Sequence, residues 1–323
     1  MSPRSRVLVV VTAVAAVSAG LVVGITAASS DRPAGVNAAG PQSRPGAPPL
    51  SIDLGVRTDA EAVDLRRALG LYEQGKHDRA AALFGRHQSL EARVGQAFAR
   101  WPDGTVGRVT QLAGLHSRSA LVQLNLGLAL FWAGQAGSQE AWRAAAEAEP
   151  DTAYAVTAGN LLYPDFARNL PVFVPVPDLP AEIRSLSPPE QLRALERLAR
   201  NGDRTGTLFY GVALQRLGRQ LSAGRVFAGL AGRSPDDVEA QVAAAVARFD
   251  KAAPAEAFSR LGPLSKRFPG AATVRFHLGV LLLWSGEVKE ARRQLRLARA
   301  AEPGSRLAGE AKRYLDELDA AGI

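Results

Sequence analysis

Residues 204–305 consist of RTGTLFYGVALQRLGRQLSAGRVFAGLAGRSPDD, VEAQVAAAVARFDKAAPAEAFSRLGPLSKRFPGA and ATVRFHLGVLLLWSGEVKEARRQLRLARAAEPGS, three successive segments of equal length. Four positions recur in all three: a small residue, an alanine, a large apolar residue and a proline. They are Gly211, Ala245 and Gly279; Ala223, Ala257 and Ala291; Phe227, Leu261 and Leu295; and Pro235, Pro269 and Pro303. The period is 34 residues, which indicates an array built from one repeated structural unit.

Each recurring position has a physical reason in a unit of two short antiparallel helices. The small residue lets the first helix approach the second closely, and the alanine lies where the two helices cross. The large residue fills the gap between repeats, and the proline ends the second helix because it cannot continue one. A single unit cannot bury its apolar face, so we expect neighbouring units to stack into a superhelix with a concave side.

This pattern resembles the tetratricopeptide-repeat family, in particular its membrane-anchored bacterial members, over most of the chain after residue 58. The resemblance implies an all-α solenoid of helix-turn-helix repeats, with an N-terminal transmembrane helix added by the sequence described below. It also implies that the protein holds another polypeptide, without naming that partner.

The composition excludes several classes of function. The chain has no cysteine, which rules out disulfides and thiol catalysis, and its four histidines have no second ligand at metal-binding spacing. No catalytic motif or phosphate-binding glycine loop occurs. The net charge of +8 is mild and lacks a basic run with interleaved aromatics. We therefore predict no enzyme activity, no metal or other cofactor, and no nucleic-acid partner.

The N-terminus carries a candidate membrane anchor. Residues 7–28 form an uncharged apolar run, roughly 33 Å long as a helix, against a bilayer core of about 30 Å. Arg4 and Arg6 precede it, which favours a cytoplasmic N-terminus and an extracytoplasmic repeat domain. A cleaved secretory signal, with a site near Ala28 and Ser29, is the alternative, and the protein would then be secreted. Gly20 and Gly24 form a GxxxG, which suggests a homodimer through this helix.

The remaining boundaries follow from composition and register. The predicted segments are a cytoplasmic tail 1–6, the transmembrane anchor 7–28, a flexible Pro/Gly/Ala linker 29–57, degenerate repeats 58–168, a Pro-rich insertion 169–187, regular repeats 188–305 and a C-terminal capping helix 306–323. Thr58 with Glu61, and Ser187 with Glu190, are predicted to begin helices as capping boxes. The region 153–203 is interpreted as one repeat whose two helices are separated by the insertion.

The insertion contains PVFVPVPDLP at residues 171–180, whose spaced prolines exclude a helix. It is apolar except for Asp178, which is unusual for an exposed loop. We predict that Phe173 and Val174 fold back onto the array between Leu124 and Leu128 on one side and Leu208 and Val212 on the other. The alternative is that this segment stays exposed and captures a partner.

The resemblance also assigns certain first-helix positions to the concave side. By register they are Leu124, Leu128, Phe131, Leu208, Val212, Gln215, Val242, Val246, Phe249, Phe276, Val280 and Leu283. Members of the family that grip a terminal carboxylate place Lys, Arg and Asn there, whereas this chain is apolar. The expected partner is therefore an apolar or extended peptide segment, unless the curvature of the array buries these positions.

These observations favour a non-catalytic, membrane-tethered interaction scaffold or assembly factor. A narrower hypothesis, by analogy, is an assembly arm like the repeat-bearing subunits of cytochrome c maturation systems. The alternative from another class is a carrier or sensor for an apolar small ligand or lipid.

Overall fold

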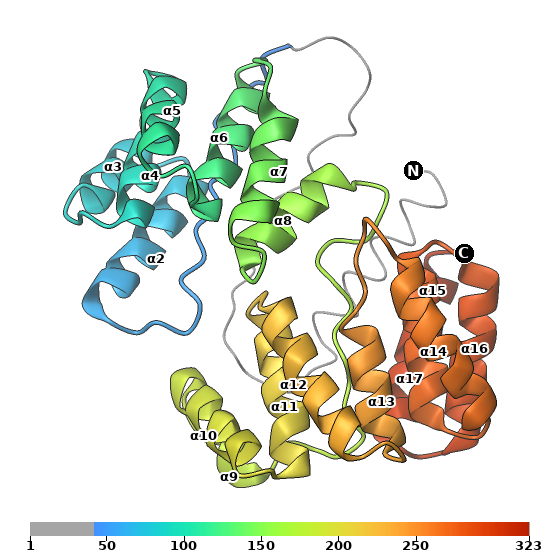
Figure 1. Ribbon diagram of the computed structural model, residues 1–323. Coiled ribbons are helices and arrows are strands. Elements are labelled where there is room, and N and C mark those ends of the chain that lie inside the picture. Colours follow the sequence, from blue (N-terminus) through green and yellow to red (C-terminus); the bar gives the residue numbers. More distant parts are fainter. Residues whose placement is uncertain (1–41, 323) are drawn as a thin grey trace. The chain divides into compact units, whose positions relative to one another are not determined.

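The computed structural model describes residues 42–322, and this part of the chain contains helices, turns and extended segments but no β-strand. It divides into two compact units, an N-terminal unit of residues 42–162 and a C-terminal unit of residues 163–322. Helices follow one another along the chain within each unit (Figure 1). The fold is therefore all-helical, with consecutive packing of the kind found in a helical solenoid.

The N-terminal unit begins with an extended segment and continues as seven helices. They are α2 (Ala60–Glu73), α3 (His77–Phe84), α4 (Leu90–Phe98), α5 (Thr105–Leu115), α6 (Ala120–Trp132), α7 (Ser138–Ala148) and α8 (Ala153–Leu162). Consecutive helices pack on each other, and α2, α4, α6 and α8 also pack in that order. The unit is thus three helix pairs followed by the single helix α8.

The C-terminal unit repeats this plan after two additional helices. It contains α9 (Ala181–Arg184), α10 (Pro188–Arg200), α11 (Arg204–Arg216), α12 (Gln220–Arg233), α13 (Val238–Val246), α14 (Ala255–Arg267), α15 (Ala272–Trp284), α16 (Val288–Ala301) and α17 (Arg306–Ala320). Helices α11 to α16 form three pairs, and α17 packs on α15 and α16. Because α8 and α10 belong to different units, the interpretation of 153–203 as one interrupted repeat is wrong.

The 34-residue columns correspond to close helix crossings. A Cβ atom built on Gly211 would lie 2.3 Å from the ring of Phe227, and one on Gly279 would lie 2.9 Å from Leu295. Such distances are too short for a real side chain, so glycine permits the two helices to approach. The large residue of each of these repeats therefore packs against the small residue of the same repeat, rather than filling only the gap to the next one.

One of the two predicted capping boxes is present, and the other helix begins at a neighbouring residue. Ser187 and Glu190 form the capping box of α10, and Ser305 accepts a hydrogen bond from the N–H of Ala308 at the start of α17. At α2 the cap is Asp59, whose carboxylate accepts from the N–H of Ala62, and not Thr58. The two side chains compete for the same donors, and the aspartate is one residue closer to the helix.

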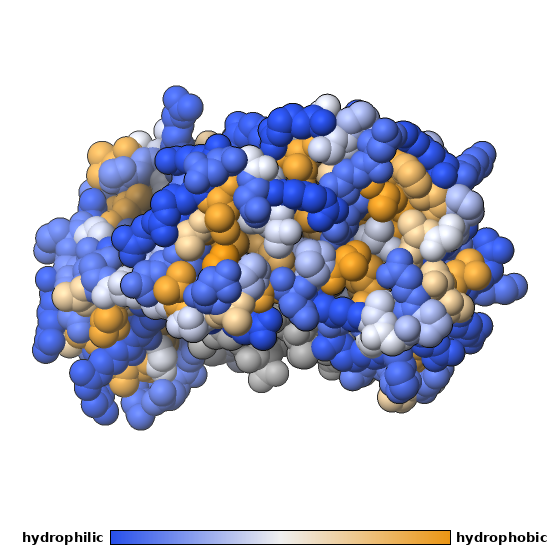
Figure 2. All heavy atoms as spheres, turned by 90° about the horizontal axis from the view of Figure 1, so that it is seen from below, coloured by the Kyte–Doolittle hydropathy of each residue, from blue (hydrophilic) through white to orange (hydrophobic). Residues whose placement is uncertain are grey.

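The predicted anchor 7–28, with Gly20 and Gly24, lies outside the described residues. Within residues 42–322, no helix is both long and apolar enough to cross a bilayer. On the face shown in Figure 2, hydrophobic residues form small groups between hydrophilic ones. The large hydrophobic residues that are exposed come from separate elements: Val63, Leu115, Tyr163, Val176, Leu221 and Leu297.

Candidate functional site

An extended segment lies within the C-terminal unit and precedes its helices. We call residues 171–178 of this segment, PVFVPVPD, the C-terminal strap. Its three prolines have no N–H to donate and cannot enter a helix interior, which keeps the chain extended. The remaining N–H groups need acceptors if they are to be buried.

Side chains from the first helices of the three repeats supply these acceptors. The N–H of Phe173 donates to Gln215 Oε1 of α11 at 2.9 Å, and that of Val174 donates to His277 Nε2 of α15 at 2.9 Å. The N–H of Val176 donates to Glu239 Oε1 of α13. Hydrogen bonds from its main-chain N–H groups therefore hold the strap against the first helix of each of the three repeats, α11, α13 and α15.

The side chain of Phe173 is fully buried. Its ring stacks on the imidazole of His277, with 4.7 Å between centroids, and meets the ring of Phe227 edge-on at 5.7 Å. Val174 is also buried, and both residues belong to the hydrophobic cluster that contains Leu208 and Val212. The expectation that this segment folds back onto its own array is confirmed for the C-terminal unit.

Basic side chains hold the two ends of the segment. Lys251 Nζ donates to the carbonyl of Ala167 at 2.7 Å, just before the strap. At the other end, Arg306 Nη1 lies 3.3 Å from the carbonyl of Pro177 and 3.5 Å from the carboxylate of Asp178. Burial lowers the pKa of Lys251 to about 7. The segment is thus fixed along its whole length rather than at one point.

Most of the twelve residues predicted to line a groove are buried in the core instead of lining an open surface. Eleven are buried: Leu124, Leu128, Leu208, Val212, Gln215, Val242, Val246, Phe249, Phe276, Val280 and Leu283. Phe131 is half-buried, and the guanidinium of Arg44 lies 4.0 Å from its ring centroid. Leu124 and Leu128 belong to the core of the N-terminal unit and not to the cluster around Phe173. In the C-terminal unit, the same hydrophobic cluster contains strap residues and predicted groove residues.

The N-terminal unit has a corresponding segment, which the sequence analysis did not predict. We call residues 44–54 the N-terminal strap. Asn125 of α6 accepts from the N–H of Ser51 at 3.0 Å and donates to its carbonyl at 2.8 Å. The hydroxyl of Tyr154 makes the same two kinds of contact with Asp53, at 3.0 and 3.2 Å. Asn125 thus binds both the N–H and the carbonyl of Ser51, and Tyr154 binds both the N–H and the carbonyl of Asp53.

Further contacts fix the start of the N-terminal strap. The hydroxyl of Tyr72 donates to the carbonyl of Pro48 at 2.5 Å, and the N–H of Arg44 donates to the carbonyl of Trp132 at 2.8 Å. Residues 29–57 were predicted to be a flexible linker. Their described part, 42–57, is instead held against helices, because first-helix side chains pair with its main chain.

The two straps are held at equivalent positions of their units. Tyr72 follows the small residue Ala68 by four positions, as Gln215 follows Gly211. Asn125 and His277 each precede the glycine of the third pair by two positions. Tyr154 and Arg306 are 27 residues after those glycines and lie at the starts of α8 and α17. We conclude that the two units share one architecture, a strap followed by an array that binds it.

Two sequence signals could have found this correspondence. An Asp-Leu pair occurs at the end of each strap, as Asp53-Leu54 and Asp178-Leu179. Pro48 and Phe173, which Tyr72 and Gln215 hold, each lie five positions before the Asp. Asn125 and His277 are also buried polar residues in otherwise apolar helices. A buried polar side chain needs a hydrogen-bond partner, so each signals a nearby main-chain group.

His277 must be neutral to hold the C-terminal strap. Its Nδ1 lies 2.7 Å from the carbonyl of Thr273, so the proton on that nitrogen leaves Nε2 free to accept from Val174. Burial lowers the pKa of His277 from 6.5 to about 4. A second proton would place an N–H on Nε2 facing the strap N–H.

We expect this histidine to make folding stability depend on pH. Because its folded pKa lies below the unfolded one, the unfolded chain binds more protons between pH 6.5 and 4. The free energy of unfolding should therefore decrease as the pH is lowered from 6.5 to 4, by about 3 kcal/mol in total. His277→Asn, which copies Asn125, should remove this component. Urea unfolding of both proteins from pH 4 to 7 measures it, and parallel pH profiles would contradict the assignment.

The described residues contain no cluster of three or more His, Cys, Asp or Glu side chains that could hold a metal ion. No protein-family model matches this sequence, and no curated protein is significantly similar to it.

Proposed function

We propose that this protein is a non-catalytic scaffold of tetratricopeptide-like repeats that binds an extended segment of another polypeptide. The observation that carries the proposal is the bidentate contact of Asn125 with the N–H and carbonyl of Ser51. Such contacts recognise main chain and tolerate varied sequence, while buried side chains such as Leu54 supply selectivity. Each array already binds an extended peptide of this kind within its own chain.

The tether is part of the same proposal. Residues 7–28 would anchor the chain in a membrane, with Arg4 and Arg6 on the cytoplasmic side and both units outside. A partner would then be an extracytoplasmic or membrane protein, as an assembly factor requires.

A peptide-binding measurement tests the proposal. The probe is a labelled peptide copying residues 42–56, and the protein is the full-length chain in detergent micelles. The parent should bind it weakly because its own strap occupies the site. Leu54→Ser removes a buried anchor of that strap and should strengthen binding about tenfold, which corresponds to roughly 1.4 kcal/mol.

Two further variants control this experiment. Leu115→Ser makes the same chemical change at an exposed position and should bind like the parent. Adding Asn125→Leu to Leu54→Ser should cancel the gain, because the main-chain contact is lost. If Leu54→Ser binds no better than Leu115→Ser, the array does not accept a polypeptide in trans and the proposal fails.

A further inference from the structure

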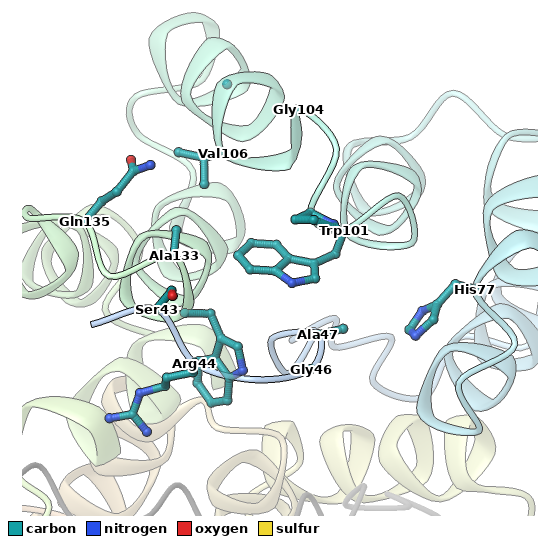
Figure 3. A pocket seen from close by; sticks show the side chains of 13 residues that line it. Ser43, Arg44, Gly46, Ala47, His77, Trp101, Gly104, Val106, Ala133 and Gln135 are labelled. Carbon is teal, nitrogen blue, oxygen red and sulfur yellow. The ribbon is translucent and has the colours of Figure 1, made fainter. Parts of the chain in front are cut away.

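A cavity of about 730 Å³ lies beside the start of the N-terminal strap. Figure 3 shows Trp101 projecting into it, with His77 and strap residues around its edge. Trp132, Val106 and Gly107 also line it. The lining thus combines two indole rings with the main chain of the strap.

The C-terminal unit fills the equivalent place with its own side chains. Trp101 follows Gly95 by six positions, as Lys251 follows Ala245, and the Asp-Leu register pairs Gln42 with Ala167. Lys251 binds the carbonyl of Ala167, so the chain before the C-terminal strap crosses this place.

Two apolar residues of that crossing chain are packed inward. Phe166 meets the ring of Phe249 edge-on at 6.3 Å, and Leu170 joins the same hydrophobic cluster. The corresponding positions of the N-terminal sequence are Pro41 and Pro45, which carry no aromatic ring. The N-terminal sequence thus lacks the phenylalanine that the other unit supplies.

The polar groups at the cavity also favour a peptide as the ligand. Among the described residues, Nδ1 of His77 is buried without a hydrogen-bond partner and could pair with a main-chain N–H. The guanidinium of Arg44 lies over the rings of Phe131 and Trp132, at 4.0 and 5.4 Å, and is thereby held at the rim. An aromatic side chain that enters beside the indole of Trp101 gains both burial and ring packing.

We propose that this cavity accepts an aromatic side chain of a partner polypeptide, as the C-terminal unit accepts Phe166. The inference rests on the proposed function, since it names the residue type that the partner would present. Recognition would then combine an aromatic anchor at the cavity with an extended main chain nearby.

The test uses blocked peptides that copy residues 164–171, PDFARNLP, with either phenylalanine or alanine at the third position. Calorimetric titration of the full-length protein should show at least tenfold tighter binding of the phenylalanine peptide. Equal binding of the two peptides, or no binding of either, would overturn the inference. Blocked phenylalanine amide alone binding as tightly as the peptide would also overturn it, since the site would then serve a small ligand.

Two glycines of α5 provide matched variants. A Cβ on Gly107 or on Gly114 would meet no heavy atom within 4 Å, so a side chain can begin at both positions without a backbone shift. Gly107 lines the cavity and Gly114 does not. Gly107→Leu should abolish selective binding of the phenylalanine peptide, whereas Gly114→Leu should retain it.

Failure of this inference can be separated from failure of the proposed function. If both leucine variants retain phenylalanine selectivity, the cavity is not the aromatic site. The proposed function still stands in that case if Leu54→Ser binds the peptide of residues 42–56. If neither kind of peptide binds, both proposals fail.

Discussion

Replacing Phe173 by alanine should lower the free energy of unfolding of the C-terminal unit by about 3–5 kcal/mol, the usual cost of truncating a buried phenylalanine. The ring is fully buried against His277 and Phe227, so its loss leaves a cavity inside the unit. Urea unfolding measures the change in free energy. Hydrogen exchange of the native protein, resolved by peptide, shows which helices are affected. Amides of α11 and α15 should exchange faster, and those of α2 to α8 should be unchanged.

Val176→Ala is the matched control for this experiment. Val176 lies on the same strap but is 38% exposed, so its truncation should change stability by less than about 1 kcal/mol. If Phe173→Ala is as stable as Val176→Ala, the strap does not belong to the core of this unit. Loss of partner capture without loss of stability would instead favour the alternative of an exposed binding segment.

The array can be predicted from the sequence because small and large residues recur at fixed positions every 34 residues. Glycine or alanine at 211, 245 and 279 is required wherever two helices cross closely, and a large residue must face it. The strap of the C-terminal unit could also be predicted, since spaced prolines exclude a helix and apolar residues favour burial. Both inferences use only local chemistry and burial.

Most of the residues that hold the straps could not be predicted in this way. The family resemblance directs attention to apolar positions such as Val242 and Val280, which are buried in the core. Of the predicted groove positions only Gln215 holds strap main chain, and the other contacts of the straps come from polar residues at registers that were not predicted, among them Asn125 and Glu239. Which polar side chain meets which N–H depends on where the extended segment lies, and that is fixed only by the folded array.

The two units also show why local composition misled the interpretation of residues 42–57. A segment rich in Pro, Gly and Ser is typical of a flexible linker. However, proline reduces the entropy lost when an extended chain is ordered, so the same composition suits a strap that docks. Acceptors at Asn125 and Tyr154 decide between these outcomes, and they lie about 75 and 100 residues away along the sequence.

Replacing Gly211 by leucine should destabilise the C-terminal unit by more than about 3 kcal/mol, because overpacking a crossing forces backbone shifts. A Cβ there would lie 2.3 Å from the buried ring of Phe227, which is rigid and fully enclosed. Gly279→Leu should cost less, since its Cβ would lie 2.9 Å from Cγ of Leu295 and 3.2 Å from the carbonyl of Ala291, which are longer distances than the one at Gly211.

Two other glycines complete an ordered series of thermal melts. A Cβ on Gly286 would meet no heavy atom within 4 Å, but φ is +79°, so Gly286→Leu should carry backbone strain of about 1–2 kcal/mol. A Cβ on the exposed Gly232 would meet no heavy atom within 4 Å, and its φ is not positive. Gly232→Leu should therefore be neutral or stabilising by up to about 1 kcal/mol, because leucine favours the helix. The melting temperature should therefore rise from the 211 variant through 279 and 286 to 232. If the melting temperature of Gly211→Leu equals that of Gly232→Leu, the close crossing at Phe227 is absent and the repeat register assigned to the array is wrong.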